Sequence, residues 1–108
     1  MKYELKARMA HKSGSNCASA VYNTFRDVNP DAGSAPFPRS EGGKCGALLA
    51  AEKTLREMGL EADFDEMFLA EFGALKCADL RRRHVPCNDL VGGAARLLET
   101  LISSRMDD

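Results

Sequence analysis

Apolar residues recur at intervals of three and four along most of the chain, which is the spacing of positions on one face of an α-helix. The clearest example begins near Cys17 and continues through Ala18, Val21, Tyr22 and Phe25. No segment shows the alternation of apolar and polar residues that is typical of a half-buried strand, and no internal repeat is present. The pattern therefore predicts an all-α protein.

Turn, capping and helix-breaking residues divide this pattern into five or six helices. Serine, asparagine and aspartate favour the start of a helix, whereas glycine often follows its end and proline interrupts it. On these signals the expected helices cover residues 4–12, 17–25, 44–58, 64–72, 75–83 and 87–104. We expect them to form a compact bundle in a single domain that spans residues 1–108.

Residues 27–43 interrupt the helical pattern. This stretch holds three of the four prolines together with three glycines, so regular structure is disfavoured over most of it. It is predicted to form one long Pro/Gly-rich loop. Loops of this length in a compact domain often lie over a site or carry part of one, although a passive connector is the alternative.

The charge balance limits the classes of partner. Lysine and arginine number 15 against 16 aspartates and glutamates, and the resulting net charge of −1 gives no general attraction to nucleic acid. The longest apolar run, residues 46–51, is far shorter than the roughly 20 residues of a bilayer span, and the N-terminal residues lack the apolar core of a signal peptide. We therefore expect a cytoplasmic protein with no nucleic-acid partner and no membrane span.

Four cysteines, Cys17, Cys45, Cys77 and Cys87, are the most informative residues for function. A resting structural disulfide is unusual in the cytoplasm, so metal ligation or a reversible thiol reaction explains them better. They lie 28, 32 and 10 residues apart and contain no C-x-x-C pair, so any shared site has to be built by the fold. The alternative is four separate packing residues that never meet.

Three of these thiols, those of Cys17, Cys45 and Cys87, fall in the predicted first turns of separate helices. Free backbone N–H groups and the helix dipole stabilise negative charge at such positions, and they can lower the pKa of a thiol from its usual value of about 8.5. We therefore expect readily ionised thiols. A thiolate is both the nucleophile of disulfide exchange and a ligand for soft metals.

Glycines surround Cys45 in the segment Gly42-Gly43-Lys44-Cys45-Gly46. Without side chains, these positions let the backbone approach a partner sulfur or an inorganic cluster closely. A flexible loop end followed by close helix packing is the alternative interpretation. If the thiols oxidise, this setting predicts that Cys45 takes part.

The order and surroundings of the four cysteines also resemble those of a known family. The matching segments lie between residues 13 and 101 and comprise Asn16-Cys17-Ala18 with Val21 and Phe25, Gly42-Gly43-Lys44-Cys45-Gly46-Ala47-Leu48, Cys77 with Leu80, and Cys87 with Val91 and Ala94-Ala95. They are similar to the redox-active proteins named for their C_GCAxxG_C_C pattern. Ala50 stands where that pattern has its last glycine, and the segment around residues 59–63 is shorter than is usual for the family.

The resemblance implies a helical domain with a cysteine-based redox role. The chain is also similar to the cysteine-bearing helical part of split-Soret cytochromes, which implies an iron–sulfur cluster as one occupant of the cysteine site. No C-x-x-C-H sequence is present, so haem attachment is not expected.

Three functional hypotheses follow for the four cysteines. In the first, Cys17, Cys45, Cys77 and Cys87 cycle between dithiol and disulfide, or hold an iron–sulfur cluster, and exchange electrons with a redox partner protein. In the second, the same residues bind structural zinc in a protein-interaction module. In the third they are packing residues. The apolar faces of so short a bundle also favour a homodimer as an alternative to a monomer.

A basic segment precedes the last cysteine. Residues 81–83 are all arginine, and they either form a plain charged surface, recognise an anionic partner, or place positive charge near the cysteines. His84 follows them, either as part of a solvated helix end or as a ligand or proton carrier. No paired-carboxylate or Ser-His-Asp arrangement can be assigned from the sequence.

Overall fold

The computed structural model describes residues 2–28, 45–60 and 62–106. Within these ranges the chain forms six α-helices and no strand, which confirms the predicted all-α class. The helices are α1 (Lys2–Lys12), α2 (Cys17–Thr24), α3 (Gly46–Glu57), α4 (Phe64–Phe72), α5 (Cys77–Arg82) and α6 (Cys87–Met106). The predicted loop over residues 27–43 lies almost wholly outside the described residues, as do Gly42, Gly43 and Lys44.

Local capping interactions explain where the helices begin and end. The side chain of Asn16 accepts a hydrogen bond from the backbone N–H of Ser19 at 2.8 Å and so caps α2. Asp63 caps α4 in the same way, with the N–H of Glu66 at 3.1 Å. Gly73 ends α4 at φ 84°, a left-handed conformation that favours glycine. These caps were predicted, because they depend on residues that are close together in the sequence.

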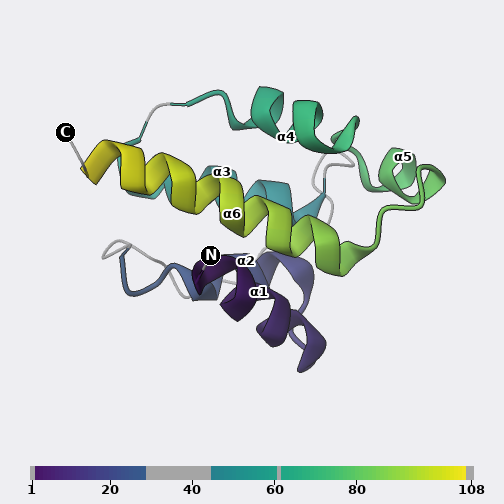
Figure 1. The fold of residues 1–108 in the computed structure, drawn as a ribbon, viewed down its shortest axis with the longest axis horizontal. Helices are drawn as coiled ribbons and strands as arrows, with labels where there is room; N and C mark the ends of the chain where they lie inside the picture. The colour runs from purple at the N-terminus through teal and green to yellow at the C-terminus, as the bar shows by residue number, and fades with distance from the viewer. Residues whose placement is uncertain (1, 29–44, 61, 107–108) are drawn as a thin grey trace.

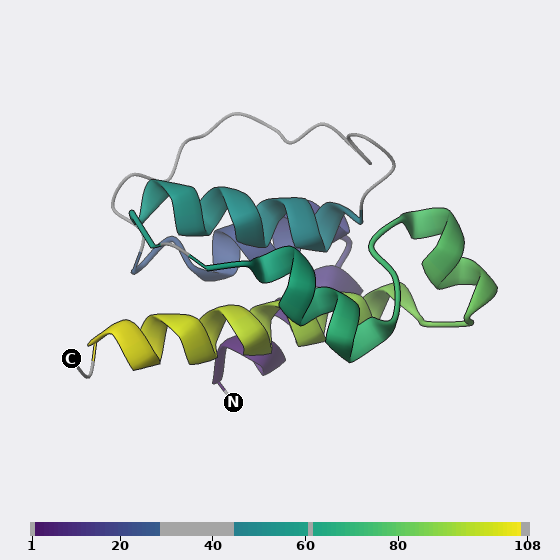
Figure 2. The ribbon, with the colours of Figure 1, turned by 90° about the horizontal axis from the view of Figure 1, so that it is seen from above.

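Helix α6 is the central element of the bundle. It packs against α1, α2, α3 and α4, and Figures 1 and 2 show these helices arranged around it. Large side chains from several helices meet there and are completely buried. They include Val21, Phe25, Leu48, Phe68, Val91 and Leu98. Burial of these apolar side chains is the main favourable contribution to folding.

Polar contacts fix α1 against the first turn of α6. The guanidinium of Arg8 forms ion pairs with Glu4 at 3.1 Å and with Asp89 at 2.8 Å. The side-chain amide of Asn88 donates a hydrogen bond to the backbone oxygen of Arg8 at 3.1 Å. Because Asn88 and Asp89 directly follow Cys87, this network holds the backbone that carries that cysteine.

Helix α5 lies at the end of the bundle where α6 begins (Figures 1 and 2). Leu80, which is 1 % exposed, anchors it in the apolar core. The backbone N–H of Cys45 donates a hydrogen bond to the carbonyl of Leu75 at 2.9 Å, which ties the segment before α5 to the start of α3. After α5 the backbone of His84 turns through a positive φ of 58° towards α6.

No helix in the described part of the chain is both long and apolar enough to cross a membrane.

Candidate functional site: a cysteine-lined cavity

All four cysteines line one small cavity. Four further side chains complete its wall: Leu80, Arg81, Val85 and Leu90. The cavity has a volume of about 30 Å³. Its cysteines come from the beginnings of α2, α3, α5 and α6, so the fold brings together residues that are up to 70 positions apart, from Cys17 to Cys87.

Each of the four cysteines stands at the start of a helix. Cys17, Cys77 and Cys87 are the first residues of α2, α5 and α6, and Cys45 is the N-cap residue of α3. The sequence predicted this position for three of them but not for Cys77, because α5 was expected to begin at Leu75. Instead, the carbonyl of Leu75 accepts the hydrogen bond from Cys45, and α5 begins two residues later. That tertiary bond leaves no signal in the local sequence.

The start of α3 is shaped to receive the sulfur of Cys17. A Cβ atom built on Gly46 would lie 2.7 Å from the Cys17 Sγ, so only glycine leaves the sulfur in its present place. The backbone N–H of Ala47 is hydrogen-bonded to the thiols of both Cys17 and Cys45. The close sulfur approach that the glycine-rich segment predicted is therefore present at Gly46.

Burial decides the protonation of the two inner thiols. It raises the pKa of Cys45 from 9.0 to about 12, against the smaller lowering effect of hydrogen bonds from the N–H groups of Leu48 and Ala47. Burial is also the largest cause of the raised pKa of Cys17, and the neighbouring charge of Cys87 adds to it. The expectation that helix starts make these thiols readily ionised is therefore wrong for Cys17 and Cys45. Loss of solvent outweighs the stabilising N–H groups.

Exposure differs from one thiol to the next. Cys45 is only 2 % exposed, Cys17 and Cys77 are half-buried, and Cys87 is exposed. Cys17 interacts electrostatically with each of the others: charges on Cys87 and Cys77 raise its pKa, and its own charge raises that of Cys45. Cys17 thus connects the exposed thiol with the most deeply buried one.

The cavity is not a preformed metal site in this conformation. No three His, Cys, Asp or Glu side chains among the described residues are placed to hold a metal ion together, and none of the four cysteines forms a disulfide. A volume of about 30 Å³ accommodates one or two water-sized atoms. Even a two-iron cluster contains four inorganic atoms, so binding one requires the thiols and the cavity wall to rearrange.

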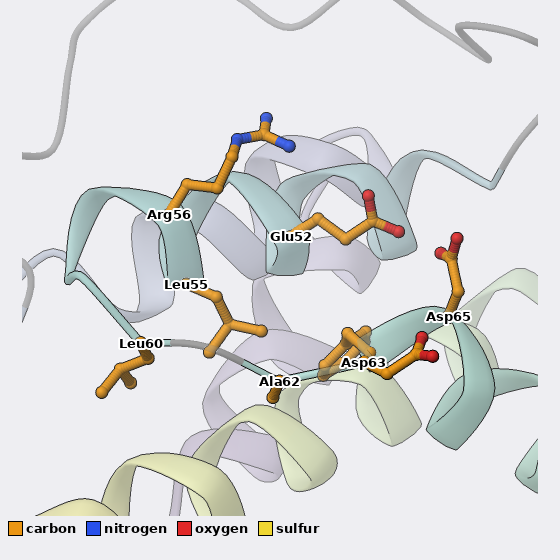
Figure 3. Close-up of a pocket in the computed structure, with 8 residues that line it drawn as sticks. Glu52, Leu55, Arg56, Leu60, Ala62, Asp63 and Asp65 are labelled. Atoms are coloured by element: carbon orange, nitrogen blue, oxygen red, sulfur yellow. The ribbon is translucent and has the colours of Figure 1, made fainter.

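A second, larger cavity lies between α3 and α4 and was not predicted. Its volume is about 360 Å³, and its lining residues are Glu52, Leu55, Arg56, Leu60, Ala62, Asp63, Phe64 and Asp65. Figure 3 shows the carboxylates of Glu52, Asp63 and Asp65 on the side of the cavity nearest the start of α4. Asp63 already caps α4. No local sequence pattern indicates this cavity, because it depends on how α3 and α4 pack.

Comparison with known proteins gives no match to a family model, a curated protein or a solved structure. The resemblance to the C_GCAxxG_C_C proteins therefore stays a prediction from the sequence.

Proposed function

We propose that this chain is a redox-active protein whose four cysteines form one site for thiol–disulfide exchange. The observation that carries the proposal is the shared cavity. Thiols separated by 28, 32 and 10 residues all line a space of about 30 Å³. Four cysteines that serve only as packing residues have no reason to converge. Redox exchange, in contrast, requires sulfur atoms that can reach one another.

The gradient of exposure supports an order of reaction. Cys87 is the thiol that an external partner can reach, and Cys17 is the half-buried thiol beside it. We expect the first disulfide to join Cys17 and Cys87. Cys45 and Cys77 are then the remaining pair, and the raised pKa of Cys45 makes this the slower one. The proposed first disulfide omits Cys45 and so departs from the prediction from the sequence that this thiol takes part when the site oxidises.

The sequence supports the same proposal independently. The family resemblance implies a cysteine-based redox role, and a reducing cytoplasm would keep the resting thiols reduced. A redox partner protein would supply or remove the electrons.

A homodimer also remains a prediction. Light scattering tests it, and a monomeric mass would contradict it.

The same four thiols support a second proposal, an iron–sulfur centre, because four cysteinates facing one space are the usual ligands of such clusters. Structural zinc in a protein-interaction module needs the same ligands. Both require the cavity to reorganise, whereas disulfide formation requires only pairs of sulfurs to meet. Thiol–disulfide exchange is therefore the function that the geometry supports best.

The test begins with protein purified without oxygen. We expect neither iron nor zinc in stoichiometric amount, four thiols that react with an alkylating reagent after unfolding, and Cys87 as the fastest to react in the folded chain. The protein is then equilibrated in glutathione buffers of increasing redox potential. Two of its thiols should form a disulfide at a lower potential than the other two. Peptide mapping by mass spectrometry should find the Cys17–Cys87 disulfide first.

Other outcomes would contradict the proposal. A brown chromophore with iron and sulfide would favour the cluster, and stoichiometric colourless zinc the interaction module. Slow alkylation of every thiol without metal would leave packing as their role. Two matched variants sharpen the test: Cys87→Ser should abolish the first disulfide, whereas Cys45→Ser should leave it intact. If both variants fail equally to form the first disulfide, the proposed order of oxidation is refuted.

A further inference from the structure

The mouth of the cysteine cavity carries one positively charged side chain. Arg81 of α5 lines the cavity together with Cys87, and both residues are exposed. No carboxylate is among the described residues that line this cavity. Because the side chain of Arg81 is long and exposed, its guanidinium can reach a molecule that binds at the sulfur of Cys87, and no carboxylate of the cavity wall opposes it.

The neighbouring arginines are engaged elsewhere. Arg82 forms an ion pair with Asp79 at 3.5 Å, and the guanidinium of Arg83 lies against the backbone of Gly73. Arg81 forms no ion pair with any carboxylate in the described part of the chain. Of the three arginines in this segment, Arg81 is the one whose charge is available at the cavity.

The size of the cavity places substrate recognition at its mouth. A space of about 30 Å³ cannot admit an organic disulfide, so the first sulfur–sulfur contact has to take place at the exposed Cys87. Groups beside Cys87 then decide which disulfides react. A guanidinium recognises carboxylates through directed, charge-assisted hydrogen bonds.

We infer that the substrate of this thiol site is a small disulfide bearing carboxylates, and that Arg81 binds one of those carboxylates beside Cys87. The inference rests on the proposed function and adds to it the chemical class of the substrate. Arg81 is a binding residue that raises the rate by holding the substrate near the thiol and does not itself exchange protons or electrons.

The reaction proceeds in two balanced steps. The Cys87 thiolate attacks one sulfur of the substrate, whose S–S bond breaks. One half leaves as a thiolate and takes up the proton that Cys87 released. The Cys17 thiolate then attacks the Cys87 sulfur and releases the second half as a thiol. Two electrons and two protons pass to the substrate, while Cys17 and Cys87 are oxidised to a disulfide.

The test compares three small disulfides of similar length: dithiodipropionate, which is dianionic, hydroxyethyl disulfide, which is neutral, and cystamine, which is dicationic. The rate constant for oxidation of the reduced protein is measured for each by mass spectrometry. Each value is divided by the rate constant for the same disulfide with mercaptoethanol, because this division removes the intrinsic reactivity of the reagent. We expect the normalised rate to favour dithiodipropionate over cystamine by about tenfold at low salt, and less at high salt.

Two charge-neutralising variants form the matched pair. Arg81→Gln should remove most of the preference for the anion, whereas Arg82→Gln removes an equally large charge outside the cavity and should change the preference by less than about twofold. Both side chains are on the surface, so unfolding in urea should show similar stability for the two variants.

The outcomes separate the two levels of the proposal. If none of the three disulfides oxidises the protein, thiol–disulfide exchange itself is wrong. If all three react at similar normalised rates, or if Arg81→Gln keeps the wild-type preference, exchange stands but the assignment of an anionic substrate is overturned.

Discussion

The buried thiol of Cys45 should make the protein lose stability in alkaline solution. Its pKa is 9.0 in the absence of the fold and about 12 in the structure. Below the lower value the thiol is neutral in both states, and its full contribution to stability is present. Between the two values the unfolded chain releases a proton that the folded chain keeps, so the free energy of unfolding falls as the pH rises.

The size of this loss follows from the two pKa values. Each pH unit between them costs up to about 1.4 kcal/mol, so the whole interval corresponds to about 4 kcal/mol. Over an experimentally convenient range, the same relation predicts a loss of about 1.4 kcal/mol between pH 8 and pH 10. This is a large share of the roughly 5–15 kcal/mol that usually stabilise a domain.

The assay compares wild-type protein with Cys45→Ala by urea unfolding from pH 8 to pH 10.5, under a reducing agent. Removing the sulfur should lower the free energy of unfolding by about 1 kcal/mol at pH 8, because the substitution leaves a small void in the core. The variant should then lose less stability as the pH rises, so the two curves should meet near pH 10. The variant Cys87→Ala, which removes an exposed thiol, is the matched control and should keep the fall in stability that is caused by Cys45, because burial of Cys45 is the largest cause of its raised pKa.

Parallel curves for wild type and Cys45→Ala over this range would refute the reasoning. They would show that the Cys45 thiol ionises equally easily in the folded and unfolded chains. Burial would then not control its chemistry, and the expected delay of the second disulfide would lose its physical basis.

Two further predictions concern glycines. Gly46→Ala should leave the free energy of unfolding in urea within about 1 kcal/mol of wild type, because the added methyl displaces only a side-chain sulfur. It should nevertheless slow formation of the disulfide from Cys17 at least tenfold. An unchanged oxidation rate would contradict the close contact. Gly93→Ala should destabilise the chain by about 1–3 kcal/mol in urea, since its methyl would overlap the ring of Phe72. The control is the double variant Gly93→Ala with Phe72→Leu, which removes the overlapping ring atoms and should recover part of the lost stability. No recovery would refute the packing argument.

The helices could be predicted because their signals are local. Asp63 caps α4 through the N–H of Glu66, three residues away, and Gly73 ends the same helix at a positive φ. The periodic apolar residues of α2 and α6 identified their buried faces for the same reason, since neighbours on a helix face are three or four residues apart. Where a boundary depended on a distant partner, as at Leu75, the prediction was two residues early.

The sequence by itself also determined which residues could carry chemistry: four cysteines, and helix starts for three of them. Their meeting in one cavity and the protonation of Cys17 and Cys45 were decided by the tertiary structure. A helix start stabilises a thiolate through nearby N–H groups, which a sequence can indicate. Desolvation depends on which side chains from other helices surround the sulfur. Only the packed bundle sets that environment, and at Cys45 it outweighs the local effect.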